Sequence, residues 1–329
     1  MLKFALIGAG RIGRIHAANL AAHPQARLVS VVDVDTGAAA AVAQRHGARV
    51  AASAAEALAA DIDALLVASS TDTHADLVEA AARAGKAVFC EKPLDLDADR
   101  ARNTLAVVAG AGTLLALGFN RRYDPSFRRL RQEARGGRIG TVEVISITSR
   151  DPAPPPVSYV QRSGGLFRDM MIHDLDMARW LLAEDPVSVY ARGSALVDPE
   201  IGRAGDIDTA VVVLETASGR LCQITNSRRC SYGYDQRIEV FGSQGLLRAD
   251  NDTATRVAVA GAGGFTTEPA LPFFLERYAA AYRAELDEFV KSLRGEPAEL
   301  ASGADGLQAL LLANAAQRSL ETRQPVMLT

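Results

Sequence analysis

Short apolar runs alternate with longer segments of helical periodicity over the first 120 residues. The apolar runs predict buried strands at residues 2–7, 28–32, 49–51, 64–68, 87–90 and 114–117. A helix is expected directly after the first strand, and further helices at residues 38–46, 53–59, 72–84 and 95–108. Asp95 is the expected N-cap of the last of these helices, and Gly85 the expected C-cap of the helix before it. Repeated strand–helix–strand units predict an α/β Rossmann domain with a doubly wound parallel sheet.

Beyond residue 120 the pattern changes to strands with few helices between them. Strands are expected at residues 142–149, 187–191, 210–215, 220–227 and 237–242, and helices at 125–135, 169–182, 276–293 and 303–321. This order predicts an α+β domain with a mostly antiparallel open sheet. A chain of 329 residues is also too long for one ordinary core. We therefore expect a dinucleotide-binding domain at 1–119 and a substrate-binding and oligomerisation domain at 120–329, with the catalytic cleft between them.

Composition limits the class of partner. Hydrophobic residues make up 48% of the chain and charged residues 23%, and the net charge is −3 without a basic block. Neither nucleic acid nor an anionic membrane is therefore expected as a partner. The three cysteines form no C-x-x-C pair, which favours reduced thiols in a cytoplasmic protein. No apolar stretch is long enough to span a bilayer, and no zinc-ligand cluster is present, which disfavours a metal-dependent alcohol dehydrogenase.

A glycine fingerprint follows the first predicted strand. Gly8, Gly10 and Gly13 give G-x-G-x-x-G where the strand should turn into a helix. These glycines allow a tight turn, close approach of backbone N–H groups to a diphosphate, and packing of helix on strand. Asp33 ends the second strand, where its carboxylate can accept hydrogen bonds from ribose hydroxyls. With Asp35 it would repel a 2′-phosphate, so the expected cofactor is NAD.

Residues 163–182, SGGLFRDMMIHDLDMARWLL, are the most specific segment of the second half. On a continuous helix Asp169, His173 and Asp176 share one narrow face. The opposite face is apolar and consists of Met171, Leu175, Ala178 and Leu182. A histidine suits the removal of a hydroxyl proton near neutral pH, and either Asp169 or Asp176 could orient its ring. A solvated helix face is the structural alternative to this catalytic interpretation.

The sequence Cys90-Glu91-Lys92-Pro93 follows another predicted strand. Lys92 would project from the strand edge where a nicotinamide is expected, and its ammonium could hydrogen-bond the reacting oxygen. Thr71 lies after the preceding strand and could contact cofactor. His74 is interpreted equally well as a cofactor contact or as a packing residue at the start of a helix. The proline-rich segment 151–159 is a candidate rim or lid of the site and equally a plain surface loop.

The motifs GAGRIGRIH, T-x-x-H, AGKAVFCEKP and D-x-x-x-H-D occur in an order that resembles the glucose–fructose oxidoreductase/inositol dehydrogenase/rhizopine catabolism family over essentially the whole chain. Residues 118–127, 163–181 and 232–242 resemble the inositol 2-dehydrogenases of bacteria within it. The resemblance implies NAD-dependent oxidation of myo-inositol to 2-keto-myo-inositol in inositol catabolism. It also implies a catalytic group of Lys92, Asp169 and His173, with His173 as the general base.

The same resemblance assigns binding residues. The cofactor-binding set is Gly8, Gly10, Arg11, Ile12, Gly13, Asp33, Ser69, Thr71, His74, Glu91 and Lys92. The substrate-binding set is Lys92, Arg121, Asp169, His173, Asp176 and Tyr234. Two choices of register remain open, Arg121 against Arg122 and Tyr234 against Tyr232. For Arg122 the sequence favours a solvent-facing turn with an internal salt bridge.

The remaining expectations concern assembly and alternatives. Alternating apolar residues such as Val211 and Val213 are consistent with a sheet face covered by a partner, and the resemblance implies a homotetramer. A related aldose or scyllo-inositol dehydrogenase is the alternative activity. A non-catalytic NAD-binding sensor is the alternative of another class, and the intact Lys92, Asp169 and His173 set argues against it.

Overall fold

The computed structural model describes residues 1–328 and divides into two compact units. The first unit contains residues 1–123 and 281–310, and the second contains residues 124–280 and the chain from 311 onward. The chain first passes from the first unit to the second after residue 123, within a few residues of the boundary predicted after residue 119. Residues 281–310, however, return to the first unit, because their apolar side chains complete its core. Local patterns in the sequence do not show that a distant helix returns to the first unit.

The first unit is built on a six-stranded parallel sheet in the order β3-β2-β1-β4-β5-β6. Its strands are β1 (Leu2–Ile7), β2 (Ala26–Val32), β3 (Arg49–Val50), β4 (Ala64–Val67), β5 (Ala87–Glu91) and β6 (Leu115–Gly118). Its helices are α1 (Arg11–Ala22), α2 (Thr36–His46), α3 (Ala54–Ala59), α4 (His74–Arg83), α5 (Ala98–Ala111) and α12 (Ala279–Leu293), with the short helices η1 (Thr71–Thr73) and η2 (Asn120–Tyr123). The order reverses between β1 and β4, which is where open α/β sheets bind their ligands. The predicted Rossmann fold is thus confirmed.

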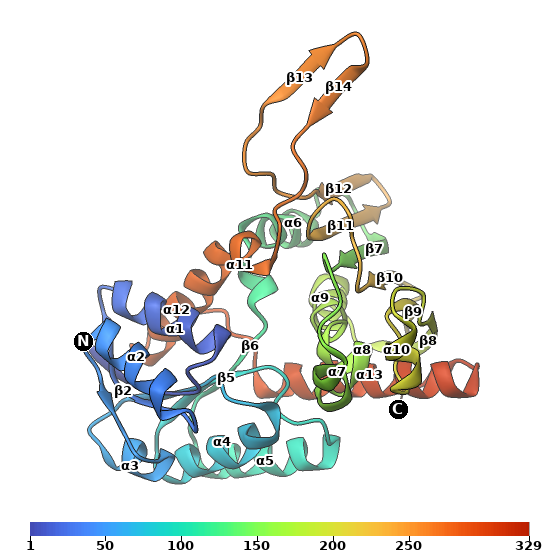
Figure 1. The fold of residues 1–329 in the computed structure, drawn as a ribbon. Helices are drawn as coiled ribbons and strands as arrows, with labels where there is room; N and C mark the ends of the chain where they lie inside the picture. Colours follow the sequence, from blue (N-terminus) through green and yellow to red (C-terminus); the bar gives the residue numbers. More distant parts are fainter. Residues whose placement is uncertain (329) are drawn as a thin grey trace. The chain divides into compact units, whose positions relative to one another are not determined.

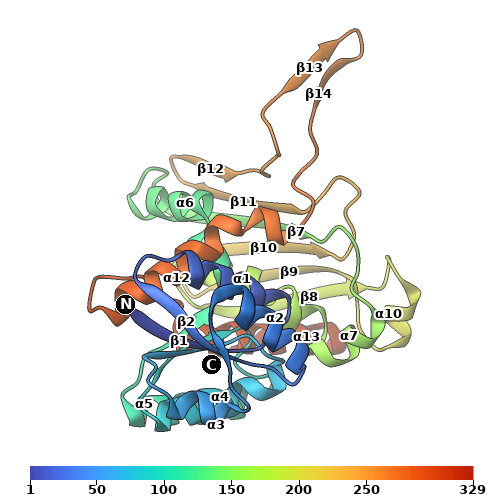
Figure 2. The same ribbon diagram turned by 60° about the vertical axis from the view of Figure 1, so that its left-hand side comes forward.

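Helices cover both faces of this sheet, with α1, α2 and α12 on one side and α3, α4 and α5 on the other (Figures 1 and 2). The central strands are therefore mostly apolar, as β4 shows with four buried residues in succession. Helix α12 closes the core, since the ring of Phe289 meets those of Phe4 and Phe89 edge-on at 6.1 and 5.6 Å. A helix from the far end of the chain is therefore part of the dinucleotide-binding unit.

The second unit is built on a seven-stranded sheet in the order β12-β11-β7-β10-β9-β8-β15. Its strands are β7 (Val142–Arg150), β8 (Pro186–Ser194), β9 (Thr209–Thr216), β10 (Leu221–Ser227), β11 (Asp235–Gly242), β12 (Gly245–Ala249) and β15 (Val326–Met327). All neighbouring strands are antiparallel except β7 and β10, which are parallel. The predicted mostly antiparallel sheet is confirmed, and β12 and β15 are added at its two edges.

One face of this sheet is covered and the other is open. Helices α6 (Pro125–Arg135) and α9 (Ile172–Leu182) pack on the covered face. The Ser319 hydroxyl of α13 (Gly303–Thr322) accepts a hydrogen bond from the Ala191 N–H of β8 at 2.9 Å. Side chains alternate along β9, where Val212 is fully buried and Val211 is 44% exposed. The large apolar side chains left exposed on the sheet strands are Val144, Tyr190, Val211, Val213, Leu221, Phe241, Leu246 and Met327.

A two-stranded hairpin extends away from the seven-stranded sheet (Figure 2). It consists of β13 (Ala258–Gly261) and β14 (Gly264–Thr267), and every residue of both strands is exposed. The predicted pattern missed this hairpin because its strands bury nothing, so they carry no alternation of apolar and polar residues. The sequence also did not predict the short helices α7 (Val157–Ser163) and α10 (Pro199–Arg203).

Several predicted boundaries differ for local reasons. The N-cap of α5 is Asp97, whose carboxylate accepts the N–H groups of Asp99 and Arg100, so the predicted cap Asp95 is wrong. The predicted helix 72–84 begins as the separate turn η1 before α4. The predicted helix 276–293 is divided at Tyr278 into α11 (Phe274–Arg277) and α12. Such capping choices depend on tertiary packing at each helix end.

Candidate active site

The glycine loop of the first unit has the shape that a bound diphosphate requires. A Cβ atom on Gly8 would lie 2.3 Å from the Ala68 carbonyl oxygen, and one on Gly13 would lie 1.9 Å from the Gly8 carbonyl oxygen. These two glycines are therefore needed for close backbone packing. A Cβ on Gly10 would contact no atom within 4 Å, and Gly10 is the N-cap of α1 without a side-chain cap. The backbone N–H groups of this helix start can therefore reach an anion.

The side chains of Asp33 and Asp35 follow β2 and have different duties. Asp33 accepts backbone hydrogen bonds from Ala9 and Asp35 at 2.5 and 2.8 Å, which ties the acid to the glycine loop. Asp35 caps α2 by accepting the N–H groups of Gly37 and Ala38 at 3.0 Å each. A carboxylate oxygen keeps a second lone pair beyond one backbone bond, so Asp33 can still accept a ribose hydroxyl.

The loops after β4 and β5 are joined by His74. Its Nδ1 lies 2.8 Å from the Pro93 carbonyl oxygen and its Nε2 lies 3.2 Å from the Ser69 carbonyl oxygen. The side chain is buried, so the geometry supports the packing interpretation of this histidine. Ser69 and Thr73 hydrogen-bond each other through their hydroxyls at 2.7 Å. Lys92 follows β5 directly and is half-buried, and the Lys92–Pro93 peptide bond is cis.

Glu91 points into the unit rather than away from it. Its Oε1 accepts a hydrogen bond from His16 Nε2 at 2.7 Å, and its carboxyl group lies against Gly118 of β6. The sequence placed Glu91 in the cofactor-binding set, and that role stays a prediction. His16, which the sequence did not single out, is the partner that the structure assigns to it.

The segment that carries Asp169 and His173 is not one continuous helix, so the prediction of an unbroken helix over 169–182 is wrong. Asp169 ends α8 (Gly165–Asp169), and α9 begins at Ile172. Between them the Met171 N–H donates to the Leu166 carbonyl five residues earlier, at 2.9 Å. This wider turn adds one residue, so the angles of a regular helix do not relate Asp169 to His173. The predicted apolar residues Met171, Leu175, Ala178 and Leu182 are all fully buried.

Two side chains that the sequence did not identify hold Asp169. The Tyr159 hydroxyl donates to its Oδ1 at 2.9 Å, and the guanidinium of Arg228 faces its Oδ2 with both terminal nitrogens at 3.4 Å. Arg228 is 1% exposed, so its charge lies inside the second unit. Tyr159 belongs to α7, within the proline-rich segment that was expected to be a rim, a lid or a surface loop. Its hydroxyl ties that segment to the candidate site.

The remaining polar groups of α9 are buried to different degrees. His173 is half-buried, and it is the only histidine of the second unit. Asp176 is 1% exposed. Asp174 is fully buried and accepts a hydrogen bond from the Asn226 amide at 3.0 Å.

The two arginines of η2 are both buried, at 5% exposure for Arg121 and 8% for Arg122. Arg122 pairs with Asp305 at 3.1 Å, which confirms its internal salt bridge and shows that its expected solvent-facing position is wrong. Asp124 caps α6 and pairs with Arg277. These partners give Arg122 and Asp124 structural duties, and the substrate role of Arg121 stays a prediction.

The two tyrosines before β11 also differ. Tyr232 is 44% exposed, and its hydroxyl donates to Asp235 at 2.6 Å and accepts from Arg150 at 2.6 Å. Burial and the bond to Asp235 raise the pKa of this hydroxyl. Tyr234 is 5% exposed and packs edge-on against Phe273 and Tyr278. The hydroxyl of Tyr232 is thus already bound within the second unit, and the substrate role of Tyr234 stays a prediction.

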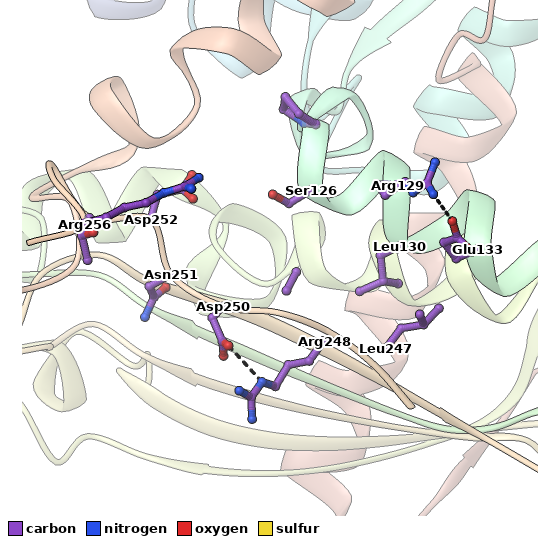
Figure 3. Close-up of a pocket in the computed structure, with 13 residues that line it drawn as sticks. Ser126, Arg129, Leu130, Glu133, Leu247, Arg248, Asp250, Asn251, Asp252 and Arg256 are labelled. Atoms are coloured by element: carbon purple, nitrogen blue, oxygen red, sulfur yellow. Dashed lines mark hydrogen bonds and ion pairs between the residues drawn. The ribbon is translucent and has the colours of Figure 1, made fainter. Parts of the chain in front are cut away.

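The second unit also has a pocket of about 750 Å³ between α6 and the segment that follows β12 (Figure 3). Arg129 pairs with Glu133 and Arg248 with Asp250 on its walls, as the dashed lines in the figure show. These charges are neutralised by their neighbours, and the lining contains none of the predicted site residues. We therefore assign it no part in the chemistry.

Fold and site together define a dinucleotide-dependent oxidoreductase. The family model for the NAD-binding Rossmann fold of the oxidoreductase family GFO/IDH/MocA matches residues 2–119, and the model for its C-terminal domain matches residues 127–248. The chain belongs to this family, and its first unit is an NAD-binding Rossmann domain.

Relatives of the chain are similar over nearly their whole length. An inositol 2-dehydrogenase of Rhizobium meliloti is 51% identical over 99% of this chain and 98% of its own. A myo-inositol 2-dehydrogenase of Thermotoga maritima is 48% identical with the same coverage. The crystal structure of a myo-inositol dehydrogenase from Corynebacterium glutamicum, 44% identical, matches with a TM-score of 0.96 over 100% of this chain and 99% of that one. A scyllo-inositol dehydrogenase from Lactobacillus casei with bound NAD(H) and scyllo-inositol, 32% identical, matches with a TM-score of 0.93 over 99% of both chains.

Two further findings concern membrane-spanning helices and the cysteine thiols. Among residues 1–328, no helix combines the length and the apolar character needed to cross a membrane. Cys90, Cys222 and Cys230 are buried free thiols, and burial raises the pKa of Cys90 and of Cys222.

Proposed function

We propose that the protein oxidises myo-inositol to 2-keto-myo-inositol with NAD. The observation that carries this proposal is the similarity, at about half of all positions and over nearly full length, to inositol 2-dehydrogenases. The glycine loop and Asp33 of this chain fit a dinucleotide whose ribose carries free hydroxyls. The chemistry that NAD supplies when bound is acceptance of a hydride from the carbinol carbon.

The chain's own residues manage the proton. His173 takes the hydroxyl proton as the C–O bond becomes a carbonyl, and it is the only imidazole of the second unit. Lys92 donates a hydrogen bond to the same oxygen and stabilises its alkoxide character. Asp169 orients the His173 ring, with Tyr159 and Arg228 fixing its own carboxylate. Asp176, Arg121 and Tyr234 bind the other hydroxyls of the ring.

The biological setting belongs to the same proposal. We infer a cytoplasmic homotetramer that serves inositol catabolism. Three buried free thiols suit a reducing compartment. The open apolar face of the seven-stranded sheet suits contact with another copy of the chain.

A panel of polyols assayed by NADH absorbance tests the proposal. Myo-inositol should reduce NAD well, and inositols that lack one hydroxyl should be rejected by as much as about 10⁴-fold in kcat/KM. The reason is that each missing hydroxyl leaves a buried polar side chain unpaired.

The panel also separates the alternatives. A higher kcat/KM for scyllo-inositol than for myo-inositol would make scyllo-inositol the preferred isomer, and the related scyllo-inositol dehydrogenase is the precedent for this. A higher kcat/KM for an aldose would replace the inositols altogether. NADH binding without turnover of any polyol would favour the sensor.

A further inference from the structure

Three ionisable side chains, one of them next to Lys92 in the chain, meet in the interior of the first unit. They are His16 on α1, Glu91 at the end of β5 and Glu285 on α12, and one ligand-type atom of each lies within 4.8 Å of the others. His16 and Glu285 are fully buried, and the Glu91 side chain is 12% exposed. Neither carboxyl oxygen of Glu285 has a hydrogen-bond partner within the unit.

The positions of these three groups are rigidly determined. Helix α12 buries Leu286, Phe289 and Val290 in the core of the first unit, which fixes the helix face that carries Glu285. The His16 ring packs edge-on between Phe89 and Tyr282 at 5.2 and 5.8 Å.

Glu91 is enclosed on two further sides. A Cβ atom on Gly118 would lie 2.8 Å from its Oε2, so the carboxyl group lies close against β6. His16 Nε2 approaches its Oε1 at 2.7 Å. A carboxyl oxygen of Glu285 also lies within 4.8 Å of a carboxyl oxygen of Glu91.

Two carboxyl groups this close in a protein interior cannot both be ionised, because each charge loses its hydration and repels the other. Glu91 accepts the His16 hydrogen bond and is partly exposed, whereas Glu285 is fully buried without such a partner. Burial and the Glu91 carboxylate raise the pKa of Glu285 well above its ordinary value. The titratable groups beside Glu285 are His16, Glu91, the Tyr282 hydroxyl one helical turn away and the Cys90 thiol next to Glu91 in the chain.

We propose that Glu285 is a positioning residue for Lys92, a role that rests on the proposed function of that lysine. Glu285 keeps its proton, and its O–H group donates a hydrogen bond to Glu91, either through one water molecule or after a small rotation of the carboxyl group. Glu91, held by His16 on one side and by Glu285 on the other, then fixes the end of β5. The backbone of Lys92, one residue further on, is thereby held in place, and with it the origin of the lysine side chain.

Thermal unfolding tests the protonation state without any assay of activity. Folded Glu285 keeps a proton that the unfolded chain loses above the ordinary glutamate pKa of 4.5, so the stability of the wild type should fall as pH rises above that value. Glu285→Gln cannot ionise, so its Tm should exceed that of the wild type at the alkaline end and vary less with pH.

Glu79→Gln is the matched control. Glu79 is also a buried glutamate of the first unit, but it is paired with Arg83 and Arg100. The same substitution there should lower the Tm.

Positioning is tested at the lysine itself. Lys92 acetylation, measured by peptide mass spectrometry with Lys3 as the internal reference, should proceed at a changed rate in Glu285→Met and at the wild-type rate in Glu285→Gln. In the polyol assay Glu285→Met should lower kcat roughly 10- to 100-fold with an unchanged KM for NAD, the penalty of misplacing a catalytic group. Glu285→Gln should retain kcat because its amide still donates.

Two results would overturn the proposal. One is a Glu285→Met variant with wild-type Lys92 acetylation. The other is a wild type that holds one equivalent of a metal ion and melts earlier after chelation, together with a destabilised Glu285→Gln, since the cluster would then be a metal site. If no polyol is turned over, the proposed substrate fails, while the unfolding and acetylation measurements still decide the role of Glu285.

Discussion

The Oδ2 atom of Asp33 accepts a hydrogen bond from the backbone N–H of Ala9 at 2.5 Å. Asp33, the acid at the end of the dinucleotide-binding motif, therefore also stabilises the glycine loop at the start of that motif. A residue chosen for its charge near the ribose is in this way part of the loop's own structure.

Asp33→Ser should therefore act twice. Removal of the carboxylate should narrow the preference for NAD over NADP by roughly tenfold, about 1.4 kcal/mol, and loss of the hydrogen bond from Ala9 should weaken NAD binding. Asp35→Ser separates the two effects, because it removes a charge that would also repel a 2′-phosphate while the hydrogen bond from Ala9 to Asp33 and the cap of α2 are kept. The ratio of kcat/KM for the two cofactors measures the effect, and a wild type that prefers NADP would contradict the assignment.

His173→Ala should lower kcat by roughly 10²- to 10⁴-fold, the usual consequence of losing a general base. NADH binding, followed by fluorescence, should stay nearly unchanged, because His173 belongs to the second unit. His46→Ala, at the end of α2, is a control that should retain wild-type kcat. Turnover near the wild-type level in His173→Ala would show that this helix face is only a surface.

Tyr159→Phe tests the hold on Asp169. Loss of one hydrogen bond to a carboxylate should lower kcat by about 3- to 10-fold, with little change in Tm. Tyr190→Phe, on the exposed face of β8, should leave kcat unchanged. Equal kcat in Tyr159→Phe and Tyr190→Phe would show that α7 has no part in the site.

Asp305 should contribute stability that acid removes. Burial opposes its ionisation, but the Arg122 guanidinium outweighs this and lowers the pKa of Asp305 from 3.8 to about 2. The folded pKa is depressed, so the contribution, on the order of 2 kcal/mol, is present above pH 3.8 and is lost as pH falls towards 2. Asp305→Asn should thus lower Tm at neutral pH, and its difference from the wild type should shrink in acid. A difference that is constant over this range would contradict the ion-pair account.

The open sheet face should hold the assembly together. Light scattering of the wild type should give the mass of a tetramer, and Val211→Asp with Val213→Asp should give a smaller species. Val34→Asp, fully exposed in the first unit, is the matched control and should assemble like the wild type. One chain's mass for the wild type at micromolar concentration would end this idea.

The sequence by itself determined the class of fold and the cofactor. The apolar runs of the first unit are readable because strands buried on both faces have few polar residues. Gly8 and Gly13 can be predicted from the sequence because the backbone geometry of the turn leaves no room for a Cβ atom at either position. Asp33 can be predicted because its negative charge favours a ribose with free hydroxyls over one with a 2′-phosphate. Pro125 likewise follows the N-cap Asp124 and begins α6 at the predicted residue.

Only the tertiary structure decided how distant segments complete each other. The turn at Met171 that displaces Asp169 from the helix of His173 depends on packing, since regular periodicity continues through it in the sequence. The partners Tyr159 and Arg228 lie 10 and 59 residues from Asp169, and no local spacing relates them. The buried Glu285 reaches Glu91 only because α12 returns to the first unit. Sequence patterns record which faces are buried, whereas the desolvation of a charge is determined by the groups that the fold places beside it.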